Sequence, residues 1–557
     1  MFKVSELAAF FSLLRQRFSE QEASLNALDG EIGDGDHGST MARTFRTVES
    51  AAAGPFSDLG DGFDAASRAI AEHAGGAIGP ILAAFFAEGG VVFAGQQEVC
   101  ADAFCRFLQG GAEAVSAIGE AEEGEKTLLD ALKPASRACA RHVDATLPTA
   151  LQEAIVASRR GVEKTKDMKA TKGRAKNVAD RSLGHQDPGA TSMSIILNVL
   201  LNTLQGERAR PQRPESETAF QVPPGKLINH PNTMVREDNE GLSLAHPDLI
   251  RLTEEGILLR AQPKTSGKVA LVIGHGGGHT PSMGGFIGPG LLDGDVYGPV
   301  FTCASGIQIA KAITHADQGA GTTLLVSNHS GDILNARLAV RRAQQEGFEV
   351  TPVYLGADIS TAPRDRYQER RGLGGLLFAL KMGGAAAEQC CHLAEVTEVM
   401  KKANQRTATL AVAVSPPSHP ATGESLFTLP EGQIEIGTGV HGEMGVYRGP
   451  HKPAREIVEM VIERLVADLS PFPTKRYLVF VNGSGGTSLM ELHIVFRDAY
   501  HALRDREITV EASVVDSFFT TQEMGGFSLS LCAVDEQLLD LWHEPCHSPS
   551  FCWPRES

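Results

Sequence analysis

The 557-residue sequence contains no run of about 18 apolar residues, the length that a membrane-spanning helix needs. It also lacks an excess of basic charge, because 51 lysines and arginines stand against 68 aspartates and glutamates. The net charge of −17 argues against nucleic acid or an anionic membrane surface as the main partner. We therefore expect neither a membrane protein nor a nucleic-acid-binding protein.

Cysteine is sparse, since only nine residues are scattered along the chain and none forms a CxxC pair. This distribution argues against a disulfide scaffold and a structural zinc site, and it suits a reducing compartment. Near the beginning of the sequence, apolar residues from Leu7 to Phe18 lie on one helical stripe. That stripe predicts a core helix rather than a signal peptide, so a cytoplasmic protein is expected.

Length and composition predict two domains joined by a linker. Residues 1–204 have apolar residues at helical spacing, and Asp187 followed by proline predicts a helix start. Residues 205–222 are polar, charged and proline-containing, which is typical of a linker. Residues 223–557 contain short apolar runs that end in glycine or polar loops, with helix-like stretches between them. The second pattern predicts an α/β fold.

The sharpest local feature is the glycine-rich acidic segment at residues 28–41. It contains Asp29, Asp34 and Asp36, and its glycines permit a tight loop in which these carboxylates converge. Such convergence is unfavourable unless a cation neutralises it, and hard oxygen ligands suit Mg²⁺ or Ca²⁺. A solvated acidic turn is the alternative. We interpret the segment as a magnesium site that holds phosphate groups.

Three further segments of the first half are candidates for phosphate contact. The glycine-rich run at 75–80 could aim backbone N–H groups at phosphate, and residues 124–135 place a Lys-Thr pair ahead of an apolar helix. Arg174 and Arg181 lie near the helix start at Asp187, although surface arginines are usually only solvated. The glycines before the Lys-Thr pair are one residue out of place for a P-loop, so we reject a Walker motif.

Taken together, these four segments resemble the nucleotide-binding domain of the dihydroxyacetone kinase family over most of residues 1–204. The resemblance implies an eight-helix barrel that holds ATP through Mg²⁺ bound by Asp29, Asp34 and Asp36. Thr40 and Ile78 depart from the family pattern, in which asparagine and serine are usual. The nucleotide-binding residues that the resemblance implies are His37, Thr40, Gly75, Gly76, Ala77, Ile78, Thr127, Leu128, Arg174, Asp187 and Gly189.

Titratable residues stand in three loops of the second half. His279 lies in a glycine-dense run after an apolar strand, Asp332 follows the next strand, and His441 lies in another glycine-flanked turn. Each histidine alone is more often structural than catalytic. Three such groups in the loops of one α/β unit nevertheless favour an acid/base site.

This half resembles the ketose-binding domain of the same family over nearly all of residues 226–557. The resemblance implies that His441 bonds covalently to the carbonyl carbon of a ketose as a hemiaminal, which glycerol cannot form. It also implies that His279 and Asp332 hydrogen-bond the reacting hydroxyl and help to remove its proton. The substrate-binding positions that it implies are Gly276, Gly277, Gly278 and Ser327.

The second half also departs from the family pattern. His275, Gly277 and Thr280 replace the usual glycine, serine and glutamate, and Ser327 stands where lysine is frequent. Because a serine leaves more room than a lysine beside the substrate, we hypothesise a ketose larger than dihydroxyacetone, such as erythrulose or a branched short ketose. The nucleotide domain precedes the ketose domain, which reverses the common order in single-chain members.

The sequence thus predicts a ketose kinase that uses ATP and Mg²⁺, and the resemblance implies a homodimer through the ketose-binding domain. The alternative from another class is a non-catalytic ketose sensor, which leaves the acidic loop unexplained. A phosphotransferase-system variant is disfavoured because its subunits are usually separate chains. An FAD-splitting side activity would use the same nucleotide site and stays open.

Overall fold

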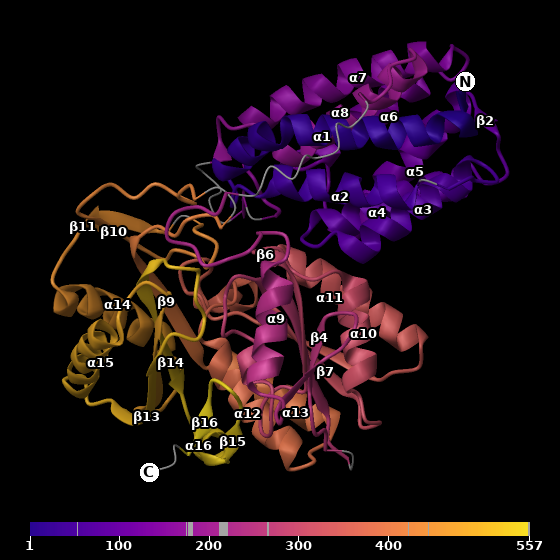
Figure 1. Cartoon of the computed structure of the whole chain (residues 1–557). Coiled ribbons are helices and arrows are strands. Elements are labelled where there is room, and N and C mark those ends of the chain that lie inside the picture. The colour runs from indigo at the N-terminus through magenta and orange to yellow at the C-terminus, as the bar shows by residue number, and fades with distance from the viewer. Residues whose placement is uncertain are drawn as a thin grey trace. The chain divides into compact units, whose positions relative to one another are not determined.

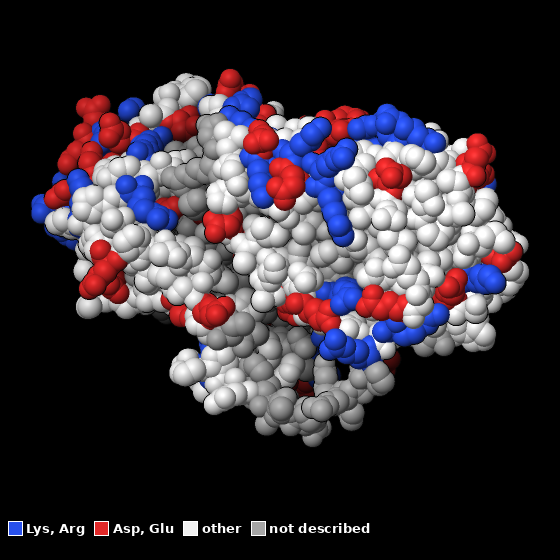
Figure 2. Space-filling view, turned by 90° about the horizontal axis from the view of Figure 1, so that it is seen from above, with Lys and Arg blue, Asp and Glu red and all other residues white. Residues whose placement is uncertain are grey.

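The computed structural model describes residues 1–52, 54–173, 175–176, 182–210, 221–264, 267–420, 423–443 and 445–554. The chain divides into two compact units, Met1–Ala219 and Phe220–Ser557 (Figure 1). Among the described residues, every helix is too short or too polar to cross a bilayer. On the face shown in Figure 2, acidic and basic side chains are interspersed.

The first unit is helical, as predicted. Its described residues form a short antiparallel pair, β1 (Phe2–Lys3) with β2 (Glu98–Val99). The predicted helix start is confirmed, because the side chain of Asp187 accepts a hydrogen bond from the Ala190 N–H at 2.6 Å. The α-helices of the described part are α1 (Leu7–Gly30), α2 (His37–Ala51), α3 (Leu59–His73), α4 (Ile78–Val92), α5 (Ala101–Gly119), α6 (Leu129–Ala140), α7 (Leu147–Lys164) and α8 (Pro188–Leu204).

Phenylalanines fill the core between these helices. Phe18 of α1 stacks on Phe45 of α2 at a centroid distance of 4.8 Å, and Phe63 of α3 lies 5.8 Å from Phe86 of α4. Cys105 of α5 and Cys139 of α6 form a disulfide that the sequence analysis did not anticipate. Their separation of 34 residues matches no local cysteine pattern, and the contact between α5 and α6 brings them together.

The second unit contains two six-stranded sheets, which confirms the predicted α/β fold. The first has the order β3-β4-β6-β5-β7-β8, with parallel pairing from β6 through β5 and β7 to β8. Carboxyl ends of parallel strands meet at one edge of a sheet, where ligands usually bind. The strands are β3 (Ile250–Leu252), β4 (Ile257–Arg260), β5 (Ala270–Gly277), β6 (Gly294–Val300), β7 (Thr322–Ser327) and β8 (Val350–Leu355).

The second sheet has the order β11-β10-β9-β14-β12-β13 and is antiparallel except between β12 and β13. Its strands are β9 (Thr407–Ser415), β10 (Gln433–Ile436), β11 (Tyr447–Pro450), β12 (Arg476–Gly483), β13 (Thr509–Asp516) and β14 (Gly525–Ala533). A further short pair joins β15 (Cys546–His547) to β16 (Cys552–Trp553).

Helices pack on both sheets (Figure 1). The first sheet contacts α9 (Met234–Ala245), α10 (Gly306–Ala316), α11 (Ser330–Gln345), α12 (Leu376–Glu388) and α13 (Leu393–Gln405), and the second contacts α14 (Ala454–Leu469) and α15 (Leu489–Arg504), while α16 (Glu536–His543) packs on α12. One buried aromatic group is shared by the two sheets: Phe286, beyond β5, lies 5.2 Å from Phe518, beyond β13. This shared core holds the loops of the two sheets in a fixed relationship.

Candidate active site

The acidic loop joins α1 to α2 in the first unit. Carboxylate oxygens of Asp29, Asp34 and Asp36 lie within 4.8 Å of one another. Asp29 Oδ2 accepts hydrogen bonds from the backbone N–H of Gly35 at 2.8 Å and of Asp36 at 3.1 Å. Gly35 has a φ of 78°, a conformation that glycine adopts without strain. This set of hard oxygen donors fits Mg²⁺.

Two helices meet beside the acidic loop. His37, the first residue of α2, has its Nε2 2.8 Å from Ser192 Oγ of α8, and burial lowers the pKa of His37. Thr40 is buried one turn further along α2, where its Oγ1 accepts a hydrogen bond from Arg43 at 3.2 Å. These contacts fix the start of α2 against α8.

The glycine-rich run leads into α4. Gly75, Gly76 and Ala77 precede the helix, and Ile78 is its first residue. Gly76 adopts a φ of 69°, and Ala77 supplies no capping side chain to the first N–H groups of α4. A helix N-terminus of this kind carries a partial positive charge and suits an anion.

The remaining predicted nucleotide residues begin α6 and α8. The Thr127 N–H donates to Asp130 Oδ2 at 2.7 Å, and Leu128 directly precedes α6. A Cβ atom placed on Gly189 would lie 3.6 Å from the Leu128 Cβ, so the two helix starts are adjacent. Burial raises the pKa of Asp187 to about 7. Arg174 lies outside the described residues.

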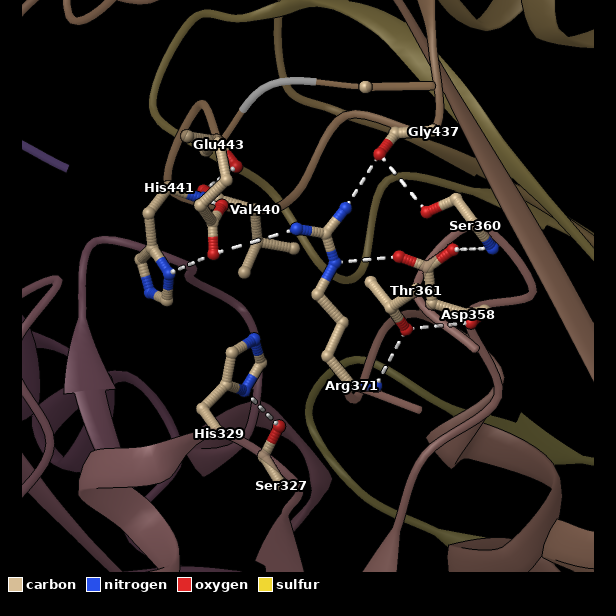
Figure 3. Close-up of polar contacts among 12 residues, drawn as sticks. Ser327, His329, Asp358, Ser360, Thr361, Arg371, Gly437, Val440, His441 and Glu443 are labelled. Carbon is tan, nitrogen blue, oxygen red and sulfur yellow. Dashed lines mark hydrogen bonds and ion pairs between the residues drawn. The ribbon is translucent and has the colours of Figure 1, made fainter. Parts of the chain in front are cut away.

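Three histidines converge in the second unit, and His329 and His441 are drawn in Figure 3. His279 follows β5, His329 follows β7 and His441 follows β10. The ring centroid of His441 lies 5.1 Å from that of His279 and 5.5 Å from that of His329. Nε2 of His279 and Nε2 of His441 are 3.3 Å apart, and both side chains are buried.

Hydrogen bonds set the orientation of two of these rings. His279 Nδ1 lies 2.7 Å from the Thr520 carbonyl oxygen, which can only accept, so this nitrogen carries the proton. His441 Nδ1 lies 3.3 Å from Glu443 Oε1. Burial, together with the neighbouring His441, lowers the pKa of His279 well below its usual value. Burial alone would raise the pKa of Glu443, but His441 and Arg371 hold it well below the usual range.

A buried arginine stands behind Glu443 (Figure 3). Arg371 Nη1 lies 3.8 Å from Glu443 Oε1, and Arg371 Nε donates to Asp358 Oδ2 at 2.6 Å. The guanidinium also donates to the Gly437 carbonyl oxygen at 2.6 Å. The line of charges therefore runs from Asp358 through Arg371 to Glu443 and ends at the His441 ring.

The other predicted ketose-site residues lie at the carboxyl ends of β5 and β7. Gly276 and Gly277 end β5, and a Cβ atom on Gly276 would lie 2.9 Å from the Thr302 nitrogen, so only glycine fits. Gly278 follows with a φ of 91°. Ser327 ends β7 and its Oγ is 3.1 Å from His329 Nδ1, whereas Asp332 lies in the first turn of α11.

Sequence reasoning missed His329, Arg371, Asp358 and Glu443. Glu443 could have been noticed, because it follows His441 by two residues in the same glycine-flanked turn. Arg371 and Asp358 have no comparable local pattern, since their contacts depend on how β8 and β10 are placed in the fold.

Family models match both halves of the chain. The Dak1 domain model matches residues 240–550 and the DAK2 domain model matches residues 31–202. An L-erythrulose kinase from Pectobacterium atrosepticum is 36% identical over 329 residues, which is 58% of this chain and 56% of that protein. A D-erythrulose kinase from Mycolicibacterium smegmatis is 35% identical over 326 residues. The chain thus aligns with only a little over half the length of these two kinases.

Solved structures match a similar share of this chain. The dihydroxyacetone kinase of C. freundii in complex with AMP-PNP and Mg²⁺ has a TM-score of 0.55 and 28% identity, covering 60% of this chain and 62% of that one. A dihydroxyacetone kinase operon co-activator has a TM-score of 0.54 and 29% identity, covering 57% of this chain and 97% of that one.

Proposed function

The chain belongs to the Dak1 domain family, and we propose on that basis that it is an ATP- and Mg²⁺-dependent kinase for a short-chain ketose. The observation that carries the proposal is that one chain contains two features. These are the paired imidazoles of His279 and His441, and the cluster of three carboxylates in the acidic loop. A binding protein alone would have no need for the second feature.

In the ketose unit, we propose that Nε2 of His441 attacks the carbonyl carbon and holds the substrate as a hemiaminal. Nε2 of His279 then accepts a hydrogen bond from the reacting hydroxyl, because Nδ1 already donates to the Thr520 carbonyl. Asp332 is the proposed base that takes the hydroxyl proton. Gly276, Gly277 and Gly278 let the substrate approach the backbone closely.

In the helical unit, Asp29, Asp34 and Asp36 would hold Mg²⁺, which supplies charge neutralisation of the phosphate oxygens during transfer. The N-termini of α2 and α4, where no side chain caps the first N–H groups, would direct those groups toward the anion. The proposed nucleotide contacts remain those of the sequence analysis, from His37 to Gly189. Residues 1–204 and 223–557 are the proposed functional domains, with 205–222 as linker.

We propose that the substrate is larger than dihydroxyacetone, with erythrulose as the leading candidate. Two features support this choice: Ser327 replaces a frequent lysine, and relatives of 35–36% identity are named erythrulose kinases. The test is ADP release from Mg·ATP by the full chain with dihydroxyacetone, D-erythrulose, L-erythrulose or glycerol. Turnover with a ketose and none with glycerol is expected, whereas turnover with glycerol would contradict the proposal.

A ketose sensor is the second candidate, because the operon co-activator resembles this chain over 97% of its own length. The same assay, combined with a binding measurement, separates the two candidates. Ketose binding without any ADP release would favour the sensor. We further propose that the protein is cytoplasmic. We also propose that it dimerises through the second unit, and sedimentation analysis of the full chain and of a variant in that unit would test the dimerisation.

A further inference from the structure

Glu443 contacts His441 twice. Its Oε2 accepts a hydrogen bond from the His441 backbone N–H at 2.9 Å, and its Oε1 lies 3.3 Å from Nδ1 of the ring (Figure 3). The turn between them is closed by the Gly442 N–H, which donates to the Gly439 carbonyl oxygen at 3.2 Å. One carboxylate therefore holds both the backbone and the ring of His441.

Glu443 keeps its negative charge although its side chain is buried. Glu443 is 4% exposed, and burying an isolated carboxylate is costly unless a cation compensates it. Arg371 supplies that compensation at 3.8 Å, but Asp358 already pairs with Arg371 at 2.6 Å. The three groups together carry one net negative charge, which lies beside the His441 ring. The other titratable rings that face His441 are His279 and His329.

Hemiaminal formation creates a positive charge at this ring. The Nε2 lone pair forms a C–N bond to the carbonyl carbon, and the C=O π pair moves onto the oxygen. That oxygen takes one proton from water, and the hydroxide left behind is neutralised by the buffer. The ring keeps its Nδ1 proton and becomes cationic. Release reverses each change, so the step needs no further reactant.

We infer that Glu443 is a positioning residue for His441: it keeps the proton on Nδ1, so that Nε2 is the nucleophile, and its charge balances the cationic ring of the adduct. The inference rests on the proposed function. Arg371 and Asp358 keep the carboxylate ionised and in place, while the Arg371 bond to the Gly437 carbonyl holds the loop that carries His441.

Glu443→Gln tests this inference, because it keeps an acceptor oxygen and removes the charge. Ketose capture is followed by ¹³C NMR with a ketose labelled at the carbonyl carbon, whose signal moves from the ketone to the tetrahedral region in the adduct. We expect capture to weaken about 10- to 100-fold, the difference between a charged and a neutral hydrogen-bond partner. Glu443→Asp, which restores the charge, should recover part of the loss.

Proton uptake gives a second readout that a merely structural role would not change. Titration calorimetry in buffers of different ionisation enthalpy should show about one proton taken up per captured ketose by the wild-type chain. We expect about none for Glu443→Gln, because without the neighbouring charge the adduct ring releases its Nδ1 proton as the oxygen takes one up. Equal uptake by the two proteins, or equal capture, would overturn the inference. Circular dichroism and urea unfolding of the full chain serve as the check that the second unit of each variant, which carries residue 443, is folded.

Asp468→Asn is the matched control. Asp468 is a largely buried carboxylate that accepts from Nη1 of Arg370 at 3.0 Å, the neighbour of Arg371, and it has no role in our site. Its capture and proton uptake should equal those of wild type, and a loss as large as that of Glu443→Gln would overturn the inference. Absence of capture by the wild-type chain itself would instead refute the proposed function.

Discussion

Nε2 of His279 lies 3.3 Å from Nε2 of His441, although 162 residues separate them in the sequence. With Nδ1 of His279 bonded to a carbonyl oxygen and Nδ1 of His441 facing a carboxylate, both Nε2 atoms carry lone pairs when the rings are neutral. Neither ring can then donate to the other. A ketose would remove this repulsion between the two lone pairs, because it offers an electrophilic carbon to one nitrogen and a hydroxyl to the other.

His441→Ala should abolish covalent ketose capture, because no nucleophilic nitrogen remains. We expect the tetrahedral ¹³C signal to disappear and turnover to fall at least about 100-fold. His315→Ala, at an exposed position in the last turn of α10, is the control and should behave as wild type. An adduct that persists in His441→Ala would assign the nucleophile to another residue.

The low pKa of His279 predicts how folding stability depends on pH. Below about pH 6.5 the unfolded chain binds a proton at this residue that the folded chain does not, so the free energy of unfolding falls as pH falls through that window. His279→Gln should lose less stability than wild type between pH 6.5 and 5. Urea unfolding at several pH values measures the difference, and parallel curves for the two proteins would contradict the prediction.

Asp34→Ala should weaken magnesium-dependent ATP binding at least about 100-fold, since it removes a carboxylate from the proposed metal site. Ketose capture by the second unit should be unchanged, because its reactive residues are in another unit. Asp144→Ala, an exposed carboxylate of the same unit, is the control. Normal nucleotide binding in Asp34→Ala, measured by calorimetry with and without EDTA, would remove the metal assignment.

Ser327→Lys should shift the substrate preference toward dihydroxyacetone. The longer side chain takes up space beside His329, which Ser327 Oγ now approaches at 3.1 Å. We expect the ratio of kcat/KM for erythrulose to that for dihydroxyacetone to fall about tenfold. An unchanged ratio would show that this position does not select the ketose.

Local sequence was sufficient for some of these features. The helical pattern, the start of α8 and the α/β rhythm follow from residues close together in the chain. The acidic loop was found in the same way, because Asp29, Asp34 and Asp36 fall within eight residues. In this loop, contacts between near neighbours bring the carboxylates together, because the Asp29 side chain accepts hydrogen bonds from the backbone N–H groups of Gly35 and Asp36.

The proposed ketose site could not be assembled from the spacing of residues in the sequence. His279 and His441 follow strands of different sheets, and their proximity depends on how those sheets pack. Their assignment came from the family resemblance. Arg371 escaped notice because a buried arginine between two carboxylates has the same sequence appearance as a solvated one. The disulfide between Cys105 and Cys139 likewise depends on helix packing.

The aromatic core shared by the two sheets has a consequence for evolution and engineering. Phe286 belongs to the part of the unit that carries His279, and Phe518 follows a strand of the sheet that carries His441. The distance between the His279 and His441 rings therefore depends on packing that lies outside the two rings themselves. A change of one methylene in that core would alter the distance between the two rings, and with it the proposed reaction, without a change in either histidine.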